Sequence, residues 1–177
     1  HRREGELPML MTFRPMMAAG ALIAFGALGF ALVLQYAFEM EPCPMCIFQR
    51  VAMVGVGVVM LVAALHGPRG FGRWVYAGLS IVAAGMGIAI AGRHVWLQSL
   101  PPDQVPACGP SLDYMLDIMP AWDVIQTVLA GDGNCAIIDA SFLGLSLPGW
   151  TLVGFVALAI WGIIAASRPT KPAGVME

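Results

Sequence analysis

The sequence predicts an all-α integral membrane protein: a four-transmembrane-helix bundle with a long external loop that contains a short amphipathic helix. Three observations support this fold class. Of the 177 residues, 59% are hydrophobic and 11% are charged, whereas a soluble domain carries about 25% charged residues. Four windows are apolar over about the 20 residues that a helix needs to cross a bilayer. None alternates as a transmembrane β-strand does, so helices are expected to satisfy the backbone in lipid.

The four predicted helices belong to one domain that covers residues 1–177. Their predicted bounds are residues 15–38, 44–65, 74–92 and 148–167. The first apolar run is too long for the core of a signal peptide, so we interpret it as a retained anchor. The second is interrupted only by Arg50. Residues 1–8 are left out of the fold prediction.

The basic residues predict how the bundle is oriented. Seven of the nine would share one side of a four-helix bundle: Arg2, Arg3, Arg14, Arg69, Arg73, Arg168 and Lys171. The positive-inside rule makes that side cytoplasmic and places both termini there. The loops at residues 39–43 and 95–147 then face the opposite, external side. A net charge of −2 offers no basic face for nucleic acid.

The loop at residues 95–147 is long enough that we expect it to be structured and functional. Apolar residues recur in it at helical spacing: Leu112, Met115, Leu116, Met119, Trp122, Ile125, Val128 and Leu129. This pattern predicts an amphipathic helix, which Pro120 is expected to bend or divide. Such a helix lies on the membrane surface or packs on top of the bundle, and the sequence leaves both open.

All four cysteines lie on the predicted external side. Cys43 and Cys46 open the second helix as a CxxC pair, and Cys108 and Cys135 lie in the long loop. On an oxidising side we expect the thiols to be paired. The simplest of the three possible connectivities joins Cys43 to Cys46 and Cys108 to Cys135.

Three interpretations of these cysteines compete. Two structural disulfides would suit the long loop but not the CxxC pair, because so small a ring stabilises little. A zinc site of four cysteines fits the spacing loosely, but an oxidising compartment disfavours the reduced thiolates that it needs. We therefore expect no metal. Redox catalysis fits best, since the dipole at a helix start favours a reactive thiolate.

Arg50 supports the redox interpretation. It lies four residues beyond Cys46, on the same helical face. An arginine at the bilayer centre costs roughly 2.5–3.5 kcal/mol, and although snorkelling lowers this cost it does not explain the choice of residue. A guanidinium could stabilise a thiolate and donate to the carbonyl oxygen of an electron acceptor. His94, at the end of the third helix, is a second candidate, with a structural role as its alternative.

The electron acceptor is inferred by elimination. The chain has no CxxCH haem motif, no glycine-rich dinucleotide fingerprint and no iron–sulfur spacing. A quinone, which diffuses in the bilayer and accepts two electrons, suits a thiol pair at the membrane edge.

The motifs together resemble those of the disulfide bond formation protein B (DsbB) family. "PCPMCIFQR" is similar to the family's P-C-x-x-C-x-[aromatic]-x-R signature. "RHVWLQ" at the end of the third helix, "GDGNC" around Cys135 and "FLGLSLPGW" before the fourth helix match in order. Two departures are Gln49, where relatives often carry an acid, and a slightly longer "GDGNC" segment.

The resemblance implies a bacterial inner-membrane protein dithiol:quinone oxidoreductase that supports disulfide formation in exported proteins. It would reoxidise a periplasmic DsbA-like thioredoxin-fold oxidase and reduce ubiquinone or menaquinone. Cys108 would form the mixed disulfide with that partner, and Cys135 would be its loop mate. Cys43 would exchange with the loop pair and Cys46 would contact the quinone. Arg50 would hold the quinone oxygen, with His94 as a further candidate at that site.

Two rival functions remain open at this level. A reductase of the vitamin K epoxide type also has a four-helix core, but its CxxC lies late in the chain. A structural membrane subunit with two inert disulfides would need neither Arg50 nor a quinone.

Overall fold

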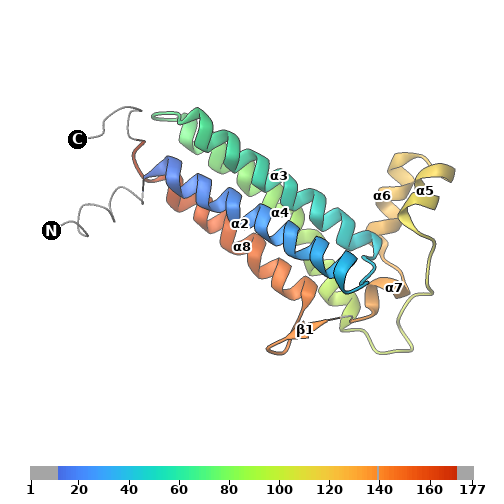
Figure 1. Ribbon diagram of the computed structural model, residues 1–177. Helices are drawn as coiled ribbons and strands as arrows, with labels where there is room; N and C mark the ends of the chain where they lie inside the picture. Colours follow the sequence, from blue (N-terminus) through green and yellow to red (C-terminus); the bar gives the residue numbers. More distant parts are fainter. Residues whose placement is uncertain (1–11, 139, 171–177) are drawn as a thin grey trace.

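Four long helices dominate the computed structural model, which describes residues 12–138 and 140–170. They are α2 (Phe13–Ala37), α3 (Pro44–His66), α4 (Gly72–Gln98) and α8 (Leu147–Ala166). Each is long and apolar enough to cross a membrane. They lie side by side, with the shorter elements gathered at one end (Figure 1). The predicted four-helix fold class is confirmed.

The long connection between α4 and α8 holds the shorter elements. These are α5 (Leu112–Ile118), α6 (Ala121–Ala130), α7 (Gly133–Ala136), β1 (Ser141–Phe142) and β2 (Leu145–Ser146). The two strands pair antiparallel, with Ser141 opposite Ser146. The predicted amphipathic segment forms α5 and α6, and Pro120 divides them as the N-cap of α6. Proline suits a helix start, where its missing N–H leaves no intrahelical bond unmade.

The third long helix ends later than the sequence predicts. Its predicted end is residue 92, but α4 continues to Gln98, so the external connection begins at residue 99. The polar residues beyond residue 92 have partners in other elements. The Arg93 guanidinium donates to the carbonyl oxygens of Leu129 and Ala130. Hydropathy falls after residue 92 because these residues contact the loop elements. The helix itself continues to Gln98.

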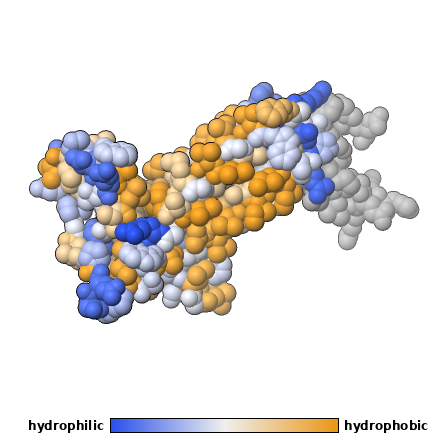
Figure 2. All heavy atoms as spheres, turned by 180° about the vertical axis from the view of Figure 1, so that it is seen from behind, coloured by the Kyte–Doolittle hydropathy of each residue, from blue (hydrophilic) through white to orange (hydrophobic). Residues whose placement is uncertain are grey.

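Small residues bring the long helices close together. Gly87 of α4 faces the ring of Phe155 in α8, and a Cβ on Gly87 would lie 2.3 Å from that ring. Phe155 itself is fully buried. Close approach at small residues is how helices pack where lipid supplies no hydrophobic driving force. The face of the bundle seen in Figure 2 is broadly apolar, with hydrophilic residues towards its ends.

Arginines cluster at the end of the bundle opposite the shorter elements. Arg14 Nε, at the start of α2, donates to the Ala64 carbonyl near the end of α3 over 2.8 Å. Arg73, at the start of α4, donates to the carbonyl of Arg168, just after α8. These bonds bring together the helix ends that the positive-inside rule assigns to one side. Arg2, Arg3 and Lys171 lie outside the described residues.

Candidate functional site

The CxxC pair lies at the first turn of α3. Cys43 is the N-cap of the helix, and Pro44 takes the first helical position. Cys46 follows one turn later, so the two sulfurs lie 3.5 Å apart. Both side chains are half-buried. The helix start thus holds two thiols near the positive end of the α3 dipole.

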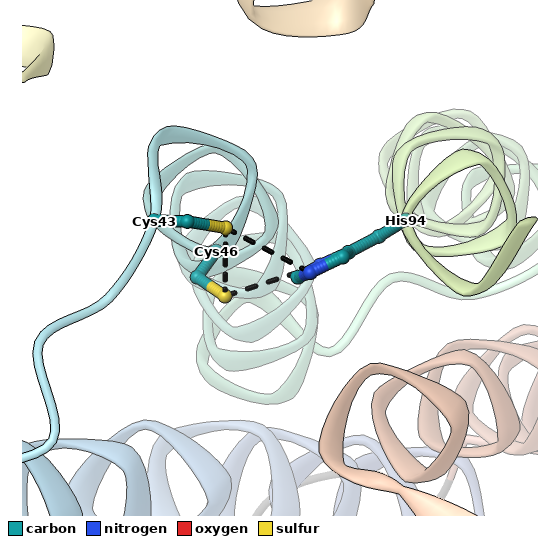
Figure 3. A group of neighbouring side chains, drawn as sticks. All are labelled: Cys43, Cys46 and His94. Atoms are coloured by element: carbon teal, nitrogen blue, oxygen red, sulfur yellow. Dashed lines mark hydrogen bonds between the residues drawn. The ribbon is translucent and has the colours of Figure 1, made fainter. Parts of the chain in front are cut away.

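His94 reaches the same pair from α4. Its Nε2 lies 3.7 Å from the Cys43 sulfur, and its Nδ1 lies 3.9 Å from the Cys46 sulfur. The imidazole is buried and points between the two thiols (Figure 3). Because α4 runs past its predicted end, His94 lies inside a helix that faces α3. Three sequence-predicted site residues from two helices therefore meet at one point.

Gln49 also contacts the imidazole, at the nitrogen nearer Cys46. Its Nε2 lies 2.9 Å from His94 Nδ1, and both side chains are buried. In the sequence Gln49 stands out only as a departure from a family pattern. Its amide within an apolar helix could have indicated a polar partner, but that partner lies 45 residues away in the chain.

A cavity of about 240 Å³ opens beside the thiol pair. Cys43, Cys46, His94 and Arg50 line it, with apolar walls from α2, α3 and the start of α8: Leu28, Phe30, Leu34, Met53, Leu147 and Pro148. It is therefore an apolar pocket whose polar groups gather near the sulfurs.

Two further glutamines contribute to the polar part of this region. Arg50 donates to the side-chain oxygen of Gln35 in α2. Gln98 lines the cavity, and its buried Oε1 has no hydrogen-bond partner among the described residues. Neither glutamine is assigned to the site by the sequence analysis. Gln35 could have been recognised as an amide inside an otherwise apolar run.

The loop cysteines lie on a different side of the pair. Cys135 is buried in α7 and packs in the same apolar cluster as Cys43. The neighbouring Cys43 thiol raises the pKa of Cys135 far above its usual range, and burial raises it further. Cys108 is exposed. The four cysteines carry free thiols, so the predicted disulfide pairing stays a prediction.

Cys108 is held near the α7 turn by close backbone contact. Gly133 N–H donates to the Ala107 carbonyl over 3.0 Å, and Asn134 donates to the Gly109 carbonyl. A Cβ on Gly133 would lie 2.7 Å from the Pro106 oxygen and 3.2 Å from the Cys108 sulfur. The segment thus brings an exposed thiol to the turn that carries the buried one.

Comparison with known proteins places this geometry in a family. The family model for the disulfide bond formation protein DsbB matches residues 13–165. That match covers α2, α3, α4, all but the last residue of α8, and all four cysteines.

The chain belongs to the DsbB family. It is 51% identical over 162 residues to disulfide bond formation protein B of Marinobacter nauticus, covering 92% of this chain and 96% of that protein. It is 51% identical over 151 residues to the protein of that name from Chromohalobacter salexigens, covering 85% and 88%. The corresponding protein of Saccharophagus degradans is 49% identical over 160 residues, covering 86% and 96%. DsbB membership makes this a disulfide bond formation protein with helices suited to a multi-pass membrane location.

Proposed function

We propose that this DsbB-family protein is a dithiol:quinone oxidoreductase that reoxidises a DsbA-like thioredoxin-fold oxidase. The observation that carries the proposal is the position of the CxxC pair between two environments. On one side lies an apolar cavity with Arg50 and Gln98, and on the other lies the loop thiol Cys135. A pair placed in this way can exchange disulfides with the loop and pass electrons into the membrane.

The cavity suits the headgroup of a quinone. Pockets for drug-sized ligands measure about 300–1,000 Å³, so a cavity of about 240 Å³ fits a single substituted ring. Arg50 can donate to a carbonyl oxygen of that ring. The unpartnered Gln98 Oε1 can accept from a hydroxyl of the reduced ring, which would satisfy an atom that is costly to leave unpaired. A bound quinone, ubiquinone or menaquinone, would supply the sink for two electrons and two protons.

The loop pair would meet the partner first. In its oxidised form the Cys108–Cys135 disulfide accepts two electrons from the partner's two thiols, through a mixed disulfide at the exposed Cys108. The partner leaves with a disulfide, and the loop keeps two thiols. Cys135 lies against Cys43, so the loop thiols can then reduce the Cys43–Cys46 disulfide by thiol exchange.

The reduced CxxC pair would then return to its disulfide by losing two electrons and two protons. Cys46 lies one turn further into the bundle than Cys43, towards Arg50, and is the thiol proposed to deliver the electrons. His94 contacts both sulfurs and is placed to take a proton as a thiolate forms. Gln49 fixes the orientation of that imidazole.

The proposed location is the bacterial inner membrane, with the cysteines in the periplasm and both termini in the cytoplasm. The opposite placement of Arg14 and Arg73 relative to the cysteines supports this orientation. A quinone pool and an oxidising compartment are both available to such a protein.

Two cysteine variants test the function. Cys46→Ser is expected to abolish quinone reduction, because the proposed electron donor is missing. Cys108→Ser is expected to keep quinone binding but stop turnover with the partner. The measurements are quinone absorbance during turnover and quinone binding by fluorescence or equilibrium dialysis. Full turnover in either variant would refute the assignment of its role.

A further inference from the structure

The side chains of Cys43, Cys46 and His94 could bind a metal ion in addition to their proposed role in electron transfer. Two thiols and an imidazole are the ligands that zinc prefers in proteins. Each of the three residues offers a ligand atom, and these atoms lie within 4.8 Å of one another. Figure 3 shows the three side chains converging from α3 and α4.

Two of the three separations match a tetrahedral metal site. Zn–S bonds of about 2.3 Å and Zn–N bonds of about 2.0–2.1 Å imply a sulfur–sulfur edge of about 3.8 Å and a sulfur–nitrogen edge of about 3.6 Å. The two sulfurs lie 3.5 Å apart, and Cys43 Sγ lies 3.7 Å from His94 Nε2. The third separation, between the Cys46 sulfur and the imidazole, lies within 4.8 Å, so zinc would draw these two groups together.

Gln49 supplies a second, independent feature of metal sites. A histidine that binds metal through one ring nitrogen normally donates its other N–H to a fixed acceptor. The Gln49 amide lies 2.9 Å from His94 Nδ1 and is buried with it. The amide O and N can be exchanged without moving the side chain, which turns the amide oxygen towards the ring. Nδ1–H then donates to Gln49, and Nε2, which lies 3.7 Å from the Cys43 sulfur, is left free to bind the metal.

Against the expectation of no metal, we propose that the reduced CxxC pair and His94 form a binding site for Zn²⁺, and that zinc bound there blocks the enzyme. Binding would release the two thiol protons, leaving two thiolates and a neutral imidazole around the ion. The ion would occupy both sulfurs, so neither could attack a disulfide or donate electrons. A pair already oxidised to a disulfide has no thiolate ligands and would bind no zinc. Zinc binding does not depend on the proposed quinone reaction, whereas the inhibition by zinc rests on that proposed function.

The binding test uses a Cys108→Ser/Cys135→Ser background, so that the loop thiols do not compete for metal. The reduced protein in detergent is titrated with Zn²⁺ against a chromophoric chelator. We expect one ion and two released protons per chain. X-ray absorption at the zinc edge should show two sulfurs at about 2.3 Å and an imidazole nitrogen at about 2.0–2.1 Å.

Variants in that background separate the site from a bare dithiol. Gln49→Leu should weaken binding by about 10–100-fold, the usual effect of losing the partner of a ligating histidine. Gln49→Glu, which keeps an acceptor, should retain it. The matched Gln126→Leu, at an exposed position on α6, should change nothing. His94→Gln should weaken binding more than Gln49→Leu.

The proposal is overturned if His94→Gln binds zinc as tightly as the background protein, or if the absorption spectrum lacks an imidazole. The spectrum is recorded with all three ligand residues in place. The test therefore does not depend on whether a variant of the site folds. In the unsubstituted enzyme, zinc should lower quinone reduction and a chelator should restore it. An enzyme that reduced no quinone would refute the proposed function while leaving the binding result intact.

Discussion

Arg50 and the CxxC pair share one face of α3, and this arrangement follows from their spacing in the sequence. The same spacing could not show that Gln35 accepts from Arg50, because that partner lies on α2. Likewise, the Gln49–His94 contact joins two helices. Contacts along one helix are thus predictable from the sequence, whereas contacts between helices depend on how the helices pack.

Arg50 is expected to act through quinone binding. Arg50→Leu removes a charged donor from the cavity, and a hydrogen bond to a charged group contributes about 1.5–3 kcal/mol. We therefore expect the KM for a short-chain quinone to rise about 10–150-fold, with thiol exchange between the partner and the loop unchanged. Arg93→Leu is the control, since Arg93 bonds to loop carbonyls at the same end of the bundle. Equal KM values for Arg50→Leu and the unsubstituted protein would contradict this role.

The raised pKa of Cys135 predicts how its reactivity depends on pH. The contact with Cys43 and burial both keep this thiol protonated in the folded, reduced protein. An unperturbed cysteine ionises near pH 8.5, and only the thiolate reacts with iodoacetamide. Alkylation of Cys135 should therefore stay slow as the pH rises through about 8.5.

Mass spectrometry of the alkylated peptides measures this dependence site by site. Unfolded protein is the control, because there the Cys135 rate should rise through the ordinary range. A folded-state rate that climbs in parallel with the unfolded one would show that the thiol is not perturbed.

At the scale of elements, α7 connects the exposed and buried loop thiols. Gly133 allows the Cys108 segment to approach, and a Cβ there would meet the Pro106 oxygen at 2.7 Å. Gly133→Ala should displace that segment. Because misplacing reacting groups by about 1 Å can cost up to about 100-fold, we expect electron transfer from partner to loop to slow at least several-fold.

Rapid mixing with the reduced partner, followed by acid quench and thiol labelling, measures that step. Gly92→Ala is the control, since a Cβ at Gly92 meets nothing within 4 Å. If the two variants exchange at the same rate, close contact at Gly133 does not matter for the loop reaction.

The elements differ in how well the sequence predicts them. Pro120 marks the division between α5 and α6 directly, because proline favours a helix start. The end of α4 is not marked, because Arg93 and His94 find partners in other elements and the helix continues past them. The sequence also places Cys108 and Cys135 in one loop, but it cannot show that Cys135 is the one buried against Cys43.

At the scale of the whole molecule, close packing at glycine holds the bundle together. Gly87 contacts the buried Phe155 ring of α8, whereas Gly85 on the same helix faces open space. Gly87→Ala should therefore destabilise the folded protein by about 1–3 kcal/mol, the usual cost of overpacking. Gly85→Ala should not. Unfolding in mixed detergent micelles compares the two free energies, and equal values would mean that α4 and α8 are not packed as described.

The whole account depends on electrons passing from a partner's thiols to a quinone through one DsbB-family chain. Stopped-flow mixing of the purified protein with a reduced thioredoxin-fold oxidase and a short-chain quinone tests this most directly. We predict that quinone absorbance falls as the partner is oxidised, with one quinone consumed for each partner disulfide formed. Partner oxidation without any loss of quinone absorbance, or no reaction at all, would contradict the account.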